Sequence, residues 1–178
     1  MIKIYCEMKS KLVKAKRYKK ITPANQYPPF SEWIWRSYSQ NTRTSLEEFI
    51  KSVKDRNLYV GTDSQNYKDN TRYTTVVIGH KSDKGGRILI HHDRTQPPIS
   101  LKHRLFMETM RSLEAAFFVS KLILSKSLIA LHLDINPSPK WESGKYKDEL
   151  IGMVIAQGFK VECKPLAWAS STVADRKT

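Results

Sequence analysis

Four acidic residues of this chain could do chemistry together: Asp63, Glu108, Asp134 and Asp175. Carboxylates that lie close together repel one another, and proteins usually relieve that repulsion with a bound divalent cation. Two Mg²⁺ or Mn²⁺ ions roughly 4 Å apart can activate a water and stabilise the leaving oxygen when a phosphodiester bond is cleaved. Such a site requires that the strands and helices of the chain bring all four side chains together.

Asp134 fits its surroundings least well of the four. It ends the apolar run IALHLD, in which a strand would place Ala130, His132 and Asp134 on one face. A carboxylate in a central strand is costly unless it is paired or bound to a metal. The alternative is that Asp134 lies at the strand end and caps the following turn. We expect His132, on the same face, to pack rather than to bind a metal.

Asp63 lies at the end of another predicted strand, in the segment VGTDSQ. Gly61 precedes it by two residues on the same face, which leaves room for a ligand to approach the sheet closely. The alternative is that Asp63 only begins the polar turn TDSQNYKDN. Taken alone, Asp63 therefore fits a site and a turn equally well.

Two glutamates lie at opposite edges of the apolar face of a helix predicted over residues 100–125. Glu108 has Leu101 and Val119 among its neighbours on the helix surface, whereas the surroundings of Glu114 are more polar. We therefore prefer Glu108 as the helix ligand and keep Glu114 as the second choice. Either residue could also be an ordinary surface glutamate.

The elements predicted around these acids form an α/β domain. LYVGTDSQ, TRYTTVVIGHK and GRILIHHD are typical of three antiparallel strands joined by hairpin turns. The long helix, the strand SLIALHLDIN, a helix over residues 141–157 and the strand KVECKPLAW follow. This order favours a mixed five-stranded sheet flanked by helices. Asp175 falls early in a last helix at ASSTVADRKT, where an acid also suits the helix dipole.

The domain is predicted over residues 44–178, after a basic and aromatic extension over residues 1–43. Residues 1–20 hold eight Lys or Arg and one Glu, a net +7 that is half of the formal charge of +14. They form either a solvated tail or an arm that lies along a phosphate backbone. The aromatic residues that follow could stack on bases, but we expect them to pack on the core. These are Tyr27, Phe30, Trp33, Trp35 and Tyr38.

The net charge of +14 indicates a polyanionic partner, most commonly nucleic acid. An acidic protein or a membrane surface would also be compatible with it. No apolar run approaches the roughly 20 residues that span a bilayer, and the N-terminus has no secretory signal. We therefore expect a cytoplasmic protein without a membrane partner. Basic residues that could contact phosphate are Lys102, His103, Arg104, Arg111, Lys121, Lys140, Lys145 and Lys147.

The order of these elements resembles the ribonuclease H fold, in which the acids come from the first strand, the first long helix, the fourth strand and the last helix. VGTDSQ, FMETMRSLEAA, LHLDIN and SSTVADRKT match that layout. The chain also resembles the bacterial YkuK-type proteins, a ribonuclease-H-like family of unknown function, over residues 44–178. LYVGTDSQ, HLDINPSP and AWASSTVAD carry this closer resemblance.

The resemblance implies that all four acids are metal ligands and catalytic residues, with Asp63 and Asp134 bridging two Mg²⁺ or Mn²⁺ ions. Glu108 and Asp175 would each complete one ion site. The resulting hypothesis is a nuclease that hydrolyses phosphodiester bonds in RNA, RNA–DNA hybrid or structured DNA. One alternative is a non-catalytic nucleic-acid-binding module with the same fold. Another is an interaction protein with an incidental acidic pocket.

Overall fold

The computed structural model describes residues 28–95, 100–123 and 129–174. Within these ranges a six-stranded sheet has the strand order β1-β4-β3-β2-β5-β6. The strands are β1 (Trp35–Ser37), β2 (Asn57–Asn66), β3 (Thr71–Lys81), β4 (Gly85–Thr95), β5 (Ile129–Leu133) and β6 (Lys160–Cys163). The helices are η2 (Phe30–Glu32), α2 (Leu46–Ser52), α3 (Leu101–Ser120), η4 (Ser143–Tyr146), α4 (Lys147–Ala156) and the π-helical η5 (Ala169–Ala174).

The sheet is mixed, as the sequence predicts. β2, β3 and β4 pair antiparallel along almost their whole lengths. β5 then pairs parallel with β2, and β6 pairs parallel with β5, because helical segments carry the chain back between them. The predicted α/β fold with three antiparallel strands first is therefore confirmed.

The sheet has one strand more than predicted. β1 pairs antiparallel with the outer edge of β4, where Trp35 lies opposite His91. Trp33 and Trp35 are buried, and Phe30 stacks on Phe118 of α3 with ring centroids 3.7 Å apart. The prediction that this aromatic cluster packs on the core is confirmed for these residues. The short strand β1 is not apparent from the sequence, because it has only three residues.

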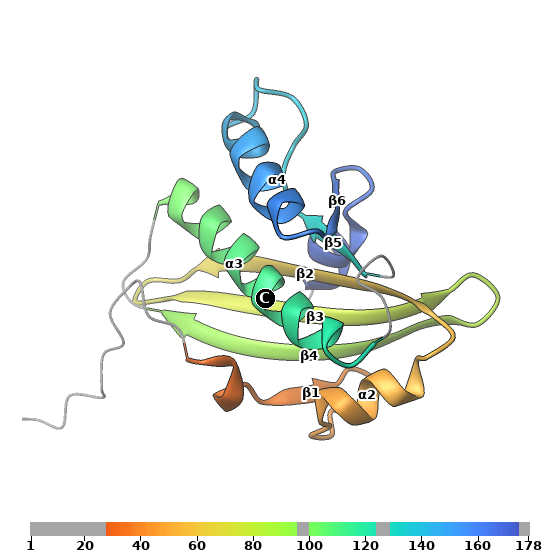
Figure 1. Cartoon of the computed structure of the whole chain (residues 1–178). Coiled ribbons are helices and arrows are strands. Elements are labelled where there is room, and N and C mark those ends of the chain that lie inside the picture. Colours follow the sequence, from red (N-terminus) through yellow and green to blue (C-terminus); the bar gives the residue numbers. More distant parts are fainter. Residues whose placement is uncertain (1–27, 96–99, 124–128, 175–178) are drawn as a thin grey trace, which may run out of the picture.

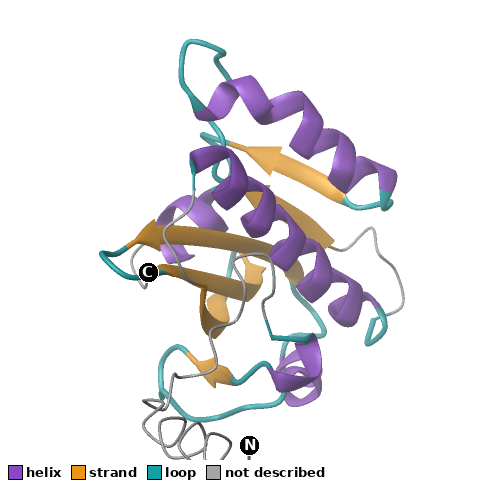
Figure 2. Ribbon diagram, turned by 90° about the vertical axis from the view of Figure 1, so that its left-hand side faces the viewer, coloured by secondary structure: helices purple, strands orange, loops and turns teal. Residues whose placement is uncertain are grey.

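The two faces of the sheet are covered differently. α3 crosses one face, and α4 runs beside it over the β5 and β6 end (Figures 1 and 2). The larger hydrophobic core lies on this side and includes Val60, Leu113 and Leu131. η5 packs on β2 and β3 over a smaller cluster that contains Val76 and Ala169. No helix within the described ranges has the length and apolar composition to cross a membrane.

α3 is anchored to the sheet by an ion pair inside the core. Arg111 of α3 is fully buried, and its guanidinium lies 2.6 Å from the carboxylate of Asp93 in β4. The same guanidinium stacks over the ring of Tyr73, 3.7 Å from its centroid. The expectation that Arg111 belongs to a phosphate-binding flank is therefore wrong. Whether Arg111 faces the core or the solvent depends on how α3 is rotated against the sheet. The sequence pattern does not determine that rotation.

Removing Arg111 should destabilise the fold strongly. In Arg111→Ala, Asp93 would remain buried without its partner, and such losses cost about 3–5 kcal/mol. Urea unfolding measures the free energy of unfolding. Arg87→Ala removes an exposed arginine from the strand that carries Asp93 and is the matched control. Equal losses in the two variants would contradict a structural role for the buried pair.

Candidate functional site

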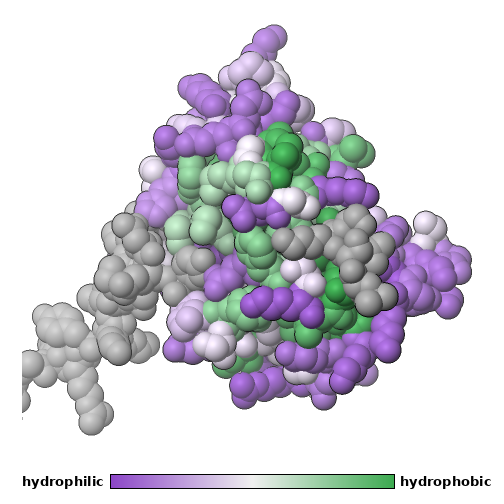
Figure 3. Space-filling view, viewed as in Figure 1, coloured by the Kyte–Doolittle hydropathy of each residue, from purple (hydrophilic) through white to green (hydrophobic). Residues whose placement is uncertain are grey.

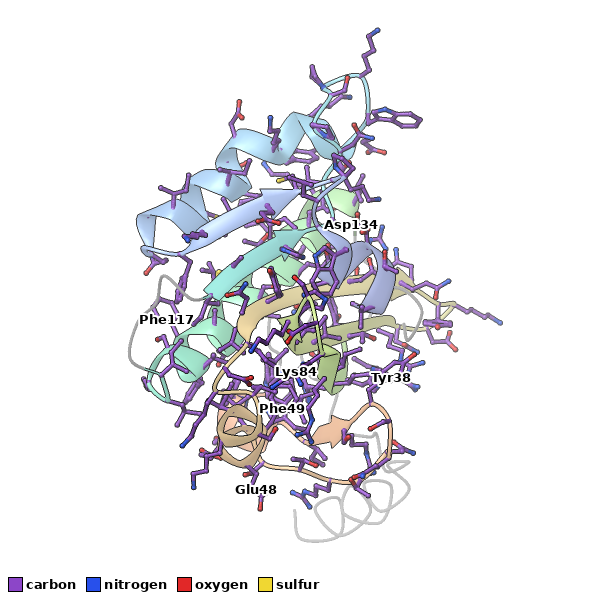
Figure 4. All side chains as sticks on the ribbon, turned by 90° about the vertical axis from the view of Figure 1, so that its right-hand side faces the viewer. Tyr38, Glu48, Phe49, Lys84, Phe117 and Asp134 are labelled. Carbon is purple, nitrogen blue, oxygen red and sulfur yellow. The ribbon has the colours of Figure 1, made fainter. Side chains whose placement is uncertain are left out.

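Three of the four predicted acids line one pocket of about 400 Å³. Asp63 comes from β2, Glu108 from α3, and Asp134 follows directly after β5. Figure 4 shows Asp134 beside the end of β5. Asp175 lies outside the described residues, which end at Ala174 of η5.

Strand register explains why Asp63 and Asp134 meet. Gly61 of β2 pairs with His132 of the parallel strand β5, so the residues two positions later stand at the same level. Leu133 pairs with Cys163 of β6, so Lys164 comes level with Asp134 in turn. The row Asp63, Asp134 and Lys164 therefore crosses three neighbouring parallel strands, near the carboxyl end of β2 and directly after β5 and β6. In open α/β sheets, this edge is where ligands commonly bind.

Glu108 reaches the pocket from the α3 side of the sheet. Its carboxylate is buried, and Oε1 accepts a hydrogen bond of 2.5 Å from Ser64 Oγ. Arg104, one turn earlier on α3, donates from Nη1 to the carbonyl oxygen of Ser64 at 2.9 Å. Ser64 is thus held between two residues of α3, which fixes the helix against the end of β2.

The charge state of Glu108 reflects its neighbours. Burial is the main cause that raises the pKa of Glu108 to about 8, and the negative charges of Asp63 and Asp134 raise it further. The hydrogen bond from Ser64 and the charge of Arg104 act in the opposite direction. Glu108 therefore holds its proton at neutral pH when no cation is bound. A bound cation would favour the ionised form.

The described part of the chain contains no group of three or more His, Cys, Asp or Glu side chains arranged as a metal site. Asp63, Glu108 and Asp134 thus share the pocket without forming such a group, and the metal cluster of four acids stays a prediction because Asp175 lies outside the described residues. Lys164 Nζ lies 2.6 Å from Asp134 Oδ1, and the carboxylate of Glu108 accepts a hydrogen bond from Ser64. The donor set still suits Mg²⁺ or Mn²⁺, because it consists of carboxylate oxygens at the mouth of a pocket.

Glu114 lies elsewhere on α3. It lines a separate, mainly apolar pocket with Met110, Phe117 and Met153, between α3 and α4. Figure 3 shows hydrophobic side chains gathered over this face of the molecule. The structure thus brings Glu108, and not Glu114, to Asp63 and Asp134.

His132 packs, as expected, and it also supports the last helix. Its ring is fully buried, and burial lowers its pKa to about 4, so the ring is neutral. Nδ1 accepts a hydrogen bond of 3.0 Å from the backbone N–H of Ala169, the first residue of η5. Since one nitrogen accepts, the neutral ring carries its proton on Nε2, which lies 3.1 Å from Glu162.

Gly61 leaves room for protein rather than for a ligand. A Cβ atom at this position would lie 2.9 Å from the backbone nitrogen of Ser170 in η5. The expectation that a ligand approaches the sheet at Gly61 is therefore wrong. The close approach instead brings η5 against β2 at Gly61, two residues before Asp63.

Sequence reasoning missed Lys164 and the partner role of Ser64. Lys164 follows the strand KVEC directly, so its position past the end of a strand was readable. Its meeting with Asp134 was not, because that depends on the β5–β6 register. The partner of Ser64 was not readable either. Its neighbour across the α3 interface, Glu108, is 44 residues away in the chain.

The raised pKa of Glu108 predicts a pH-dependent stability. Between its unfolded value of 4.5 and about pH 8, the folded protein keeps a proton that the unfolded chain has lost. The stabilisation is complete below pH 4.5 and is lost as the pH rises through 8. Relative to Glu108→Gln, the free energy of unfolding should fall by about 1.4 kcal/mol per pH unit in this window. Urea unfolding in EDTA at pH 5 to 8 measures it.

Glu114→Gln is the control for this titration, because it removes a glutamate from the same helix outside the pocket. It should follow the wild-type pH dependence. If wild type and Glu108→Gln show the same slope, Glu108 does not titrate in this window.

Comparison with known proteins agrees with this architecture. The family model described as Ribonuclease H-like matches residues 41–178. The uncharacterized protein YkuK of Bacillus subtilis (strain 168) is 29% identical over 166 residues, which cover 80% of this chain and 94% of that protein. No solved structure matches the chain. With its mixed sheet and the acids at the ends of β2 and β5, the chain belongs to the ribonuclease H-like family.

Proposed function

We propose that this protein is a divalent-metal-dependent nuclease that hydrolyses phosphodiester bonds in RNA, RNA–DNA hybrid or structured DNA. The observation that carries the proposal is the convergence of Asp63, Glu108 and Asp134 on one pocket from three separate elements. Membership of the ribonuclease H-like family and the net charge of +14 support nucleic acid as the partner.

Asp63, Glu108, Asp134 and Asp175 would hold the Mg²⁺ or Mn²⁺ ions. When bound, the ions supply an activated water and stabilise the leaving oxygen. The residues of the chain contribute orientation and charge. Ser64 and Arg104 hold α3, and with it Glu108, against the end of β2.

Positive charge in the pocket supports a phosphate ligand. Arg104 and Lys164 both line it together with the acids. A phosphate bound in the pocket would contact both of these cationic side chains. The predicted basic arm in residues 1–20 lies outside the described residues and stays a prediction.

An exposed tryptophan stands at the rim of the same pocket. The side chain of Trp141 is 62% exposed, although it lines the pocket with Asp134. Its loop is tied down by backbone hydrogen bonds from Trp141 to Ser138 and from Gly144 to Trp141. A Cβ at Gly144 would collide with the carbonyl oxygen of Ser138. A fixed loop that presents a bare indole suits stacking on a nucleic acid base.

A non-catalytic nucleic-acid-binding module is the second candidate. The Lys164–Asp134 pair favours it, because one acid of the proposed site already has a counterion. The lack of a three-ligand metal group within the described residues favours it as well. This candidate predicts binding without cleavage.

Cleavage of labelled RNA, hybrid and branched DNA with Mn²⁺ separates the two candidates. Asp134→Asn should reduce the cleavage rate by about a hundredfold or more, because it weakens a metal ligand. Asp148→Asn, an exposed acid in the first turn of α4, is the control and should cleave like wild type. Absent cleavage in wild type, or unchanged cleavage in Asp134→Asn, would reject the nuclease.

Trp141 is tested by binding in Ca²⁺, without cleavage. Trp141→Ala should weaken the affinity for a single-stranded oligonucleotide about tenfold, as expected for one lost base stack. Trp141→Phe should retain most of the affinity. Tyr38→Ala is the control, because Tyr38 is an exposed aromatic residue far from Asp134 (Figure 4). Equal effects of Trp141→Ala and Tyr38→Ala would show that Trp141 does not stack on the ligand.

A further inference from the structure

One ion pair lies inside the candidate site. Lys164 Nζ is 2.6 Å from Asp134 Oδ1, and both residues line the pocket that holds Asp63 and Glu108. Lysine and a divalent cation would therefore compete for the same carboxylate.

The main chain holds this pair in position. Asp134 and Lys164 each come directly after strands that pair in parallel up to Leu133 and Cys163. One residue further, the N–H of Lys164 still donates to the carbonyl oxygen of Ile135 at 3.3 Å. The two Cα atoms thus face each other whatever the lysine side chain does.

The two partners differ in their freedom to move. The side chain of Lys164 is 43% exposed, whereas that of Asp134 is 18% exposed. A lysine ammonium on a flexible four-carbon stem can move into water with little loss, because it is strongly hydrated there. Asp134 remains beside the pocket in either case. The exchangeable partner is therefore the lysine.

The negative charge of the pocket favours a positively charged partner for Asp134. Asp63 and Asp134 lie close enough to raise the pKa of the buried Glu108. Without a cation, this negative charge needs compensation, and Lys164 provides it at Asp134. With a divalent cation on Asp134, the ammonium at its present place would be repelled.

We propose that Lys164 is an exchangeable counterion, which neutralises Asp134 in the cation-free protein and leaves it when a divalent cation binds. The released ammonium stays at the pocket wall, where it would contact a phosphate of the bound nucleic acid. The proposal rests on the proposed cation site. Lys164 then has two opposite effects, because its ammonium weakens cation binding and strengthens nucleic acid binding.

Calorimetric titration of the full chain with Mn²⁺, without nucleic acid, tests the exchange. Lys164→Met should bind Mn²⁺ about tenfold more tightly than wild type, because the competing charge is gone. Lys160→Met is the matched control, since it removes an exposed lysine from β6, the strand that Lys164 follows, away from the pocket. It should bind like wild type. Lys164→Gln repeats the test in a second variant, and thermal unfolding in EDTA shows that each variant folds.

The second measurement is oligonucleotide affinity in Ca²⁺. Lys164→Met should bind the oligonucleotide more weakly than Lys160→Met, although it binds Mn²⁺ more tightly. The exchange is overturned if Lys164→Met and Lys164→Gln bind Mn²⁺ no better than Lys160→Met, or if no variant binds it. A protein that shows the expected Mn²⁺ affinities but cleaves nothing would reject the nuclease and keep the exchange.

Discussion

The parallel pairing of β2 with β5 sets the level of Asp63 against Asp134 in the candidate site. Because Gly61 pairs with His132, Asp63 and Asp134 stand side by side where the two strands separate. The same register, continued into β6, brings Lys164 level with Asp134. A shift of one residue would turn the apolar side chains of β5 away from the core. The hydrophobic core therefore holds the acids in register.

This arrangement has an electrostatic cost, and the described neighbours compensate for it one acid at a time. Glu108 is buried beside like charges and keeps its proton. Asp134 is neutralised by Lys164, and Ser64 donates to Glu108. In the proposed cation site, an ion would replace the proton of Glu108 and the lysine at Asp134.

The two faces of the sheet serve the site differently. α3 is locked by the buried pair of Arg111 with Asp93, so Glu108 has a fixed height above β2. η5 is held on the opposite face by the hydrogen bond from Ala169 to His132 and by the close approach of Ser170 to Gly61. Of these two helices, α3 lines the described pocket with Arg104 and Glu108, whereas η5 packs on β2 from the other side.

The sequence by itself determined the strands, the long helix and the acids that end or flank them. The alternation of apolar and polar residues along β2 and β5 and the apolar face of α3 are local patterns. Asp63, Glu108 and Asp134 could therefore be selected from them as candidate site residues. Only the tertiary structure decided which partners these acids have. Lys164 depends on register between strands about 30 residues apart in the chain, and Arg111 depends on the rotation of α3. β1 was missed because it has only three residues, and its pairing with β4 and the packing of Trp35 on His91 make it a strand.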